Sequence, residues 1–152
     1  LFNGDWGEKG FASYQKGYDL AITDWILMLA KLEKLNDKGV TILMLAHLKV
    51  KTFKNPLGPD YDRYACDIHD KTWSATHRWV DAALYGTYET IVEEKKGKRP
   101  KGIGLNARIL YTERRDAFDA KNRYGMPEVI DIPNEPSQIW PTIWTNIKTE
   151  ER

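Results

Sequence analysis

The chain has 152 residues, of which 41% are apolar, 30% charged and 12% aromatic, and its formal net charge is +1. This length suits one domain of ordinary size, and the abundance of Trp and Tyr excludes a disordered chain. No apolar run approaches the roughly 18 residues that a transmembrane helix requires, which argues against a membrane-spanning protein. The single cysteine, Cys66, excludes an internal disulfide, and we recognise no signal peptide; both observations indicate a reducing compartment.

The first residues are unusual for the start of a protein. The chain begins at Leu1 rather than at a methionine, and residues 1–17 are rich in glycine and aromatic side chains. We therefore expect a piece of a longer protein, in which the preceding segment holds part of the functional site.

Residues 18–46 have the pattern of a helix followed by a buried strand. Apolar side chains recur with the period of a helix over residues 18–37, and Gly39 follows at a position where a left-handed residue closes a helix. Residues 40–46 are a continuous apolar run, typical of a strand that is covered on both faces in a parallel sheet. The predicted buried face of the helix consists of Ile22, Trp25, Ile26, Leu29 and Leu32.

After this strand the sequence predicts a long loop, a short helix and several short strands. Residues 48–67 lack helical periodicity, and a structureless loop of this length inside a compact domain is usually functional. A helix is predicted over residues 70–80. Strands are expected at residues 81–90, 89–94, 106–112, 118–121 and 129–132, with 89–94 and 106–112 as the arms of a hairpin.

The order of these elements defines the expected fold class. A helix and a buried strand followed by hairpins suit an α/β domain, in which parallel strands with flanking helices are extended by antiparallel hairpins. We expect residues 1–133 to form this domain. Residues 134–152 contain two prolines and are predicted to form a loosely attached tail, with Trp140 and Trp144 docked.

Positive charge is concentrated toward the C-terminus. Residues 95–152 carry a net charge of +4, and five of the seven residues 95–101 are basic. Such a cluster fits either a solvated hairpin tip or contact with the phosphates of a nucleic acid. The second interpretation makes candidate DNA contacts of Lys95, Lys96, Lys98 and Arg99.

Three residues are candidates for contact with a phosphate. His47 ends the predicted apolar strand, and ligands of open α/β sheets bind beyond the carboxyl ends of the strands. The alternative is a histidine that only caps a backbone group. Lys121 and Arg123 lie two residues apart, so on an extended chain they point the same way and can grip a polyphosphate together. The alternative for this pair is an edge strand that faces solvent, where the charges prevent aggregation.

Other kinds of site find little support. The spacing of Cys66 and His69, with His77 nearby, does not supply the three or four converging ligands of a zinc site, so we expect no metal site. No serine lies in a G-x-S-x-G turn. The phosphate-binding motif G-x-x-x-x-G-K-[ST] is also absent, so these 152 residues by themselves are not an ATPase.

Six short stretches carry a resemblance to a known family. They are GDWGEKGF (4–11), LAH (45–47), DYDRY (60–64), KTW (71–73), WVDA (79–82) and AKNRYGMP (120–127). In this order and spacing they resemble phage-encoded RecA-like ATPases of the AAA class, the group that includes ATP-dependent single-strand annealing recombinases. The stretches are distributed over most of the length of residues 4–133.

The resemblance implies part of a RecA-like P-loop NTPase core, whose phosphate-binding loop and Mg²⁺-binding aspartate lie upstream of Leu1. ATP and Mg²⁺ are then expected for the complete protein and neither for this piece alone. His47 is implied to sense the γ-phosphate of ATP, and Lys121 and Arg123 to reach the γ-phosphate held by a neighbouring subunit. Fixed positive charge at that place favours phosphoryl transfer.

The implied partners are single-stranded DNA and further copies of the chain, assembled as a ring or a filament in the cytoplasm of a bacterial host. The long loop at residues 48–67 is implied to match the RecA-like loop that contacts this DNA. Its candidate DNA contacts are Lys49, Lys51, Lys54 and Arg63.

Two alternative functions remain open from the residues alone. A non-catalytic nucleic-acid-binding module would stack bases on Tyr61, Tyr64 or Tyr111. A metal-dependent nuclease would instead use His69, His77 and nearby aspartates.

Overall fold

The computed structural model describes residues 16–93 and 101–147, and these divide into two compact units. Unit 1 comprises residues up to Lys49 together with Cys66–Val80, and unit 2 comprises Val50–Ala65 together with the residues from Asp81 onward.

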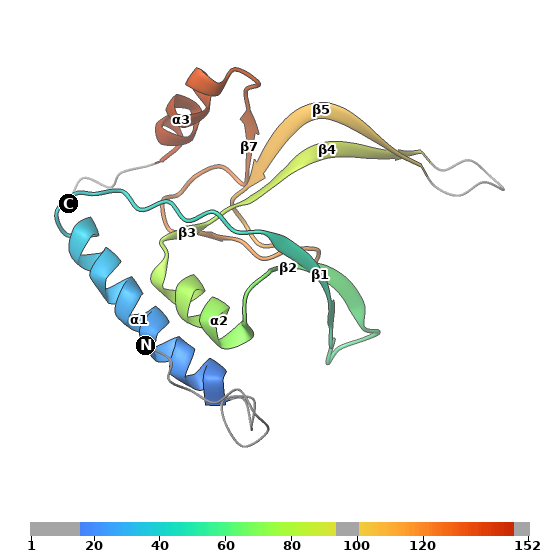
Figure 1. Ribbon diagram of the computed structural model, residues 1–152. Helices are drawn as coiled ribbons and strands as arrows, with labels where there is room; N and C mark the ends of the chain where they lie inside the picture. The colour runs from blue at the N-terminus through green and yellow to red at the C-terminus, as the bar shows by residue number, and fades with distance from the viewer. Residues whose placement is uncertain (1–15, 94–100, 148–152) are drawn as a thin grey trace. The chain divides into compact units, whose positions relative to one another are not determined.

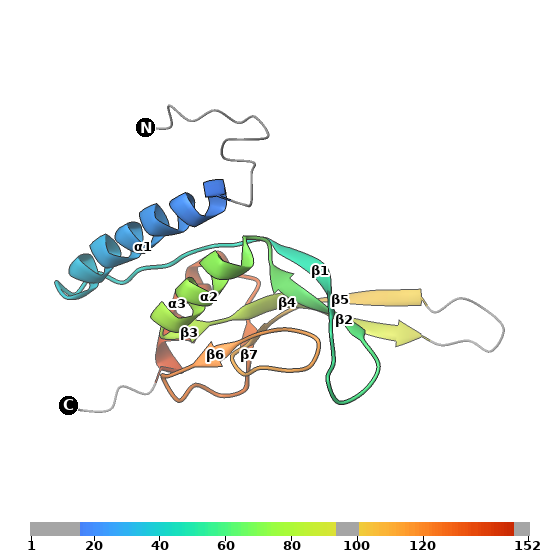
Figure 2. The ribbon, with the colours of Figure 1, turned by 90° about the horizontal axis from the view of Figure 1, so that it is seen from below.

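Unit 1 is built on two helices, α1 (Lys16–Asn36) and α2 (Asp70–Trp79), which pack against each other (Figures 1 and 2). Both helices are confirmed where the sequence predicts them. On α1, Leu29 is buried and Ile22, Trp25 and Leu32 are half-buried as expected, whereas Ile26 is exposed.

Polar contacts fix the pairing of the two helices. The Trp25 indole N–H donates to the hydroxyl of Thr76 at 2.8 Å, and Thr76 is buried. The Trp79 indole N–H donates to the carboxylate of Glu33, and Lys71 forms an ion pair with Asp19. Since the α1–α2 contact leaves much of α1 uncovered, only part of the amphipathic face of α1 is used within unit 1.

Gly39 ends α1 as predicted. Its φ of +83° is left-handed, and its N–H donates to the carbonyl of Asn36 while the N–H of Val40 returns to the carbonyl of Leu35. These two bonds satisfy carbonyl groups that the last helical turn would otherwise leave open.

The strand predicted for residues 40–46 is wrong. Within the described residues this segment pairs with no strand, and its residues 41–46 make no backbone hydrogen bond. Leu43 and Leu45 are 58% and 89% exposed. A strand needs a partner for its N–H and C=O groups, and no described strand lies beside this one.

The long loop predicted for residues 48–67 is also wrong, because most of it forms a hairpin. Strands β1 (Leu48–Phe53) and β2 (Tyr61–Cys66) pair with each other, and the turn between them is held by side chains (Figure 1). The side-chain oxygen of Asn55 accepts a hydrogen bond from the N–H of Leu57, and the Asp60 carboxylate accepts one from the N–H of Asn55. The Asn-Pro and Gly-Pro pairs that suggest a loop therefore belong to a tight turn.

Unit 2 contains two further small sheets. The three-stranded sheet has the order β4-β5-β7 with both pairings antiparallel, and the two-stranded sheet pairs β3 with β6, also antiparallel (Figures 1 and 2). Their bounds are β3 Ala82–Ala83, β4 Tyr85–Glu93, β5 Lys101–Tyr111, β6 Lys121–Asn122 and β7 Val129–Ile132.

The predicted hairpin is confirmed by β4 and β5, although both arms begin earlier than the predicted residues 89–94 and 106–112. The separate strand predicted at 81–90 is divided between β3 and the first part of β4. The predicted strand 129–132 is confirmed by β7. The strand expected at 118–121 is shorter and later, since Phe118 forms only isolated bridges. One of these, with Tyr64, is parallel. The described residues thus form a mixed α/β fold with small antiparallel sheets, and the expected parallel sheet is not among them.

The core of unit 2 is an aromatic cluster. Tyr85 and Phe118 stack face to face with ring centroids 4.1 Å apart, and Tyr64 and Tyr111 pack beside them. Buried apolar side chains complete the core: Ala120, Met126 and Ile130.

The chain after β7 forms helix α3 (Pro136–Thr145), which contacts β7 and is more ordered than the predicted tail. Pro136 stands at the first helical position, where its missing N–H costs nothing. Trp140 and Trp144 stack on each other but are 44% and 48% exposed, so the prediction that they dock is wrong. Among the described helices, none is long and apolar enough to cross a bilayer.

Candidate functional site

The predicted phosphate contacts Lys121 and Arg123 lie at a well-braced turn of unit 2. The side-chain oxygen of Asn122 accepts from the N–H groups of Tyr124 (3.1 Å) and Met126 (3.2 Å), and its amide donates to the carbonyl of Met126 (2.8 Å). Gly125 takes a left-handed φ of +59°, which glycine adopts at little cost. The turn is therefore fixed from inside by one asparagine.

Arg123 is held by Asp81. Its guanidinium Nη1 lies 3.1 Å from Asp81 Oδ1, and its backbone N–H donates to the Asp81 carbonyl, also at 3.1 Å. The hydroxyl of Tyr124 donates to the other oxygen of the same carboxylate at 3.2 Å. More than half of the Arg123 side chain stays exposed. The turn thus presents a guanidinium to solvent in a defined direction.

Lys121 is half-buried on β6, directly before this turn. Burial lowers its pKa, the neighbouring Arg123 charge lowers it further, and Asp81 partly opposes both. The Arg123 charge thus lies close enough to act on the ammonium group. The sequence-based prediction that the two cations act together stays a prediction, and the geometry places them at one turn.

His47 has a different setting from the one predicted. It is exposed, lies just before β1 rather than at the end of a strand, and its carbonyl accepts from the N–H of Asp67 at 2.8 Å. His47 belongs to unit 1, whereas Lys121 and Arg123 belong to unit 2. Its predicted role as a γ-phosphate sensor stays a prediction.

The predicted DNA contacts of residues 48–67 lie on the β1–β2 hairpin, where two of them already have carboxylate partners. Lys49 pairs with Asp67 at 3.0 Å, and Lys54 pairs with Asp60. Both ion pairs are exposed and so exchange readily with other charges. The remaining predicted DNA contacts, Lys95, Lys96, Lys98 and Arg99, lie outside the described residues.

One face of this hairpin combines aromatic and basic side chains. Phe53 packs on Tyr61 with ring centroids 5.3 Å apart, and the Arg63 guanidinium lies over the Phe53 ring at 5.5 Å. Arg63 Nη2 is buried and has no hydrogen-bond partner within the described residues. Lys51 shares this face because successive side chains of a strand alternate. We call Lys51, Phe53, Tyr61 and Arg63 the hairpin face.

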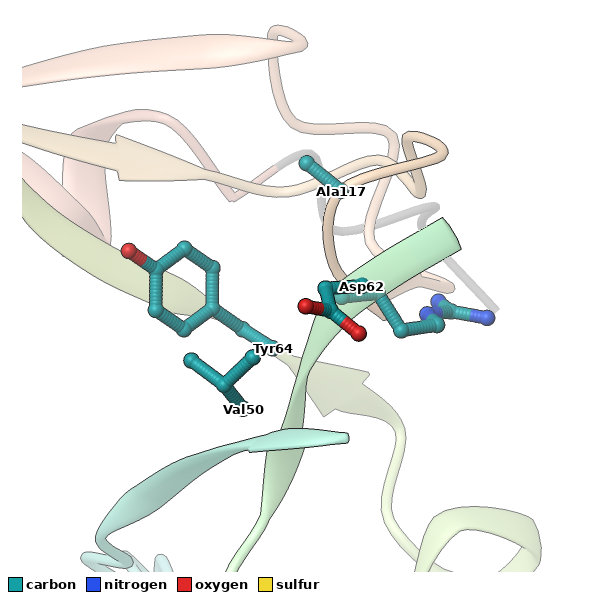
Figure 3. Close-up of a pocket in the computed structure, with 5 residues that line it drawn as sticks. Val50, Asp62, Tyr64 and Ala117 are labelled. Carbon is teal, nitrogen blue, oxygen red and sulfur yellow. The ribbon is translucent and has the colours of Figure 1, made fainter. Parts of the chain in front are cut away.

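A hollow of about 160 Å³ beside the hairpin is lined by Val50, Asp62, Arg63, Tyr64 and Ala117 (Figure 3). One Asp62 oxygen already accepts a hydrogen bond from the hydroxyl of Thr52 at 2.7 Å. The wall therefore combines an acidic and a basic residue, Asp62 and Arg63, with a tyrosine and two apolar side chains.

A family model described as an AAA domain matches residues 4–124, which is most of the sequence. The chain belongs to the AAA domain family. No curated protein and no solved structure matches the chain. The AAA domain family is a class of P-loop NTPases, so the chain is a nucleotide-binding, ATPase-like module. His47, Asp81, Lys121 and Arg123 all lie within the matched part.

Mg²⁺, which accompanies ATP in P-loop NTPases, finds no ligand set in the described part of this AAA domain. Within it, no group of three or more His, Cys, Asp or Glu side chains could hold a metal ion. The predicted phosphate contacts Lys121 and Arg123 are cations, whose chemistry suits a phosphate and not a metal ion.

The histidines considered for a nuclease site have packing roles in this AAA domain. The ring of His69 stacks on Tyr18 at 4.6 Å, and His77 packs edge-on against Trp73 at 5.2 Å. Burial is also the main cause of the raised pKa of the Cys66 thiol, so Cys66 remains protonated and is a poor metal ligand at neutral pH.

Sequence reasoning missed three residues of the AAA domain's candidate sites. Asp81 gives no local signal because its partner Arg123 lies 42 residues away. Asn122 could have been found, since an asparagine three residues before a glycine often bonds to the backbone of the following turn. Phe53 could have been found, since it lies two residues after Lys51 in an alternating segment.

Proposed function

We propose that this AAA domain is part of a RecA-like ATPase of the phage recombinase type, acting on single-stranded DNA in recombination or replication. Hydrolysis of ATP is coupled to assembly of several copies of the chain, and the phosphate-binding loop lies outside these 152 residues. The observation that carries the proposal is the exposed Arg123 guanidinium, braced on its turn within a chain of the AAA family.

The chemistry of phosphoryl transfer explains why such an arginine is useful. Negative charge spreads over the oxygens of the transferred phosphoryl group, and a guanidinium placed beside them stabilises the transition state. An exposed arginine on a braced turn can enter the nucleotide site of a neighbouring copy. Assembly and hydrolysis are then coupled, because each site is complete only at a contact between copies.

Arg123→Ala tests this proposal in the complete gene product. An arginine supplied in trans is worth about 10³- to 10⁵-fold in kcat, so the variant is expected to lose at least about 10³-fold while fluorescent ATP analogues still bind. Arg115→Ala is the matched control, because Arg115 forms an equally exposed ion pair with Glu128 in the same unit. Normal hydrolysis by Arg123→Ala would contradict the proposal.

A mixing experiment tests the contact between copies. Arg123→Ala subunits are combined with subunits whose phosphate-binding loop is disabled but whose Arg123 is intact. Hydrolysis is expected to return in the mixture, because the intact arginine reaches the nucleotide of the Arg123→Ala neighbour. If the mixture stays inactive although the two variants co-assemble, Arg123 acts in the nucleotide site of its own subunit.

The DNA part of the proposal is supported by the hairpin face. Phe53 and Tyr61 offer rings for base stacking, and Lys51 and Arg63 offer charge for the backbone, the usual combination for single-stranded nucleic acids. Each phosphate contact contributes about 0.7 to the slope of log Kd against log salt concentration for single strands. The double variant Lys51→Gln/Arg63→Gln is therefore expected to lower this slope by about 1.4.

Lys34→Gln is the control for the salt titration, since Lys34 is an exposed lysine on α1 away from the hairpin sequence. An unchanged slope in the double variant would remove the hairpin face from the DNA interface.

The same face favours a second candidate function, a non-catalytic nucleic-acid-binding module. Such a module binds DNA as this chain alone and without ATP, whereas the proposed ATPase binds DNA in an assembly whose affinity depends on the nucleotide. If the affinity for DNA is equal with and without ATP, and Arg123→Ala binds DNA as tightly as the wild type, the second function is established.

A further inference from the structure

Asp81 occupies an unusual position between the two predicted phosphate contacts and the rest of unit 2. It directly precedes β3, whose pairing with β6 sets Ala83 opposite Lys121 and Ala82 opposite Asn122. The backbone of Asp81 therefore extends the β3–β6 pairing by one hydrogen bond, from the N–H of Arg123 to the Asp81 carbonyl. Asp81 and Arg123 are thus held opposite each other by the backbone, before any side chain acts.

The Asp81 carboxylate is divided between two donors. One oxygen accepts a hydrogen bond from Arg123 Nη1, and the other accepts one from the Tyr124 hydroxyl. An arginine has five N–H donors in a planar fork. The described contacts of the Arg123 side chain use one of its three nitrogens, so an edge of the guanidinium stays available to a further acceptor.

In this turn the Arg123 side chain keeps more conformational freedom than the backbone. Asn122 and Gly125 fix the backbone on one side, and the Asp81 carbonyl fixes it on the other. A long exposed arginine otherwise samples many rotamers, and fixing it in one of them costs side-chain entropy. Asp81 reduces this freedom without burying the charge, since both side chains stay about half exposed.

We infer that Asp81 is a positioning residue, which aims the Arg123 guanidinium at the terminal phosphate of a nucleotide held by another copy of the chain. Tyr124 assists by holding the second carboxylate oxygen. This inference rests on the proposed function and deepens it, because it assigns to Asp81 a part in the same reaction. Asp81 makes no contact with the nucleotide itself and acts through Arg123.

The first test measures the contact without any nucleotide. In the wild-type chain, ¹⁵N NMR of the arginine side chains is expected to show restricted rotation of the Arg123 guanidinium, and Asp81→Asn is expected to free it. Burial raises the pKa of Tyr124, and the Asp81 charge and hydrogen bond raise it further, so the variant should also titrate Tyr124 at lower pH. Unchanged signals for both residues would overturn the inference.

The second test measures catalysis in the complete gene product. Misplacing a catalytic group by about 1 Å costs up to about 10²-fold, so Asp81→Asn is expected to lower kcat 10- to 100-fold with KM changed by less than about 2-fold. Asp81→Glu, which keeps the carboxylate, should recover part of the loss. Glu128→Gln is the matched control, because it breaks the exposed ion pair with Arg115 and leaves Arg123 alone.

A double variant separates this inference from the proposed function. If Asp81 acts only through Arg123, Asp81→Asn/Arg123→Ala is no slower than Arg123→Ala. An added loss in the double variant would assign Asp81 to another task and overturn the inference. If Arg123→Ala is inactive but Asp81→Asn is normal, the positioning role fails and the proposed function stands. If Arg123→Ala is normal, both fail.

Discussion

At the scale of single residues, the most informative core position of unit 2 is Tyr85. It is buried, stacks on Phe118 and touches both Tyr64 and Tyr111. Burial raises the pKa of its hydroxyl above 10, the value of a free tyrosine, and a hydrogen bond with Thr87 opposes this only in part. A core tyrosine of this kind links the stability of unit 2 to alkaline pH.

The sign of this link follows from proton binding. Above about pH 10 the unfolded chain loses the Tyr85 proton while the folded chain keeps it, so the folded state binds more protons and stability falls as pH rises. Tyr85→Phe keeps the ring and removes the titrating group. We expect the free energy of unfolding of this variant to fall less between pH 9 and pH 11.5 than that of the wild type, in urea titrations at each pH.

Tyr88→Phe serves as the control for the alkaline titration, because the Tyr88 ring is more than half exposed on the same strand, β4. If Tyr85→Phe and Tyr88→Phe follow the wild-type pH profile equally, the Tyr85 hydroxyl is not protected from solvent.

The residue scale also shows what sequence patterns find and what they miss. Lys121 and Arg123 stand out because their spacing is local, and the structure does place them at one turn. Asp81 lies 42 residues before Arg123, and no local pattern joins them. The pairing of β3 with β6 brings Asp81 and Arg123 together. Each of these strands has two residues and is too short to show a periodicity in the sequence.

At the scale of elements, long periodic segments were predictable and short ones were not. Helix α1, helix α2, the β4–β5 hairpin and β7 lie close to their predicted ranges, because each has enough residues to show its period or is marked by a turn. The β1–β2 hairpin was missed although Leu48–Lys51 alternates apolar and polar residues, because that alternation is short and the Asn-Pro and Gly-Pro pairs that follow it are typical of a loop.

The two faces of the β1–β2 hairpin nevertheless differ in kind. One carries the packed rings of Phe53 and Tyr61 with Arg63, and the other carries the Thr52–Asp62 hydrogen bond. A hairpin can present such distinct surfaces because its side chains alternate, which a disordered loop cannot do. Of the cations predicted for DNA, Lys49, Lys51 and Arg63 thus lie on paired strands.

At the scale of the whole molecule, membership in the AAA family offers an explanation for the apolar segment at residues 40–46. This segment has the composition of a strand covered on both faces, yet within the described residues it is unpaired and Leu45 is 89% exposed. Apolar runs of this kind are found in the parallel sheets of α/β domains. In the proposed ATPase, strands from outside these 152 residues would cover it.

Two leucines of unit 1 give a direct test of this exposure. Leu29 is 5% exposed on α1, whereas Leu45 stands in the unpaired segment. In this chain, Leu29→Ala is expected to lower the free energy of unfolding by about 2–5 kcal/mol, because it leaves a cavity. Leu45→Ala is expected to change it by less than about 0.5 kcal/mol, as at most surface positions.

The complete gene product should behave differently if added strands cover the segment. There Leu45 becomes a core residue, and Leu45→Ala is expected to cost about as much as Leu29→Ala, about 2–5 kcal/mol in the same urea titration. A negligible cost in both settings would show that residues 40–46 stay uncovered and would remove them from the sheet of the ATPase. A large cost already in the 152-residue chain would show that the segment packs within it, contrary to the exposure that the structure gives to Leu45.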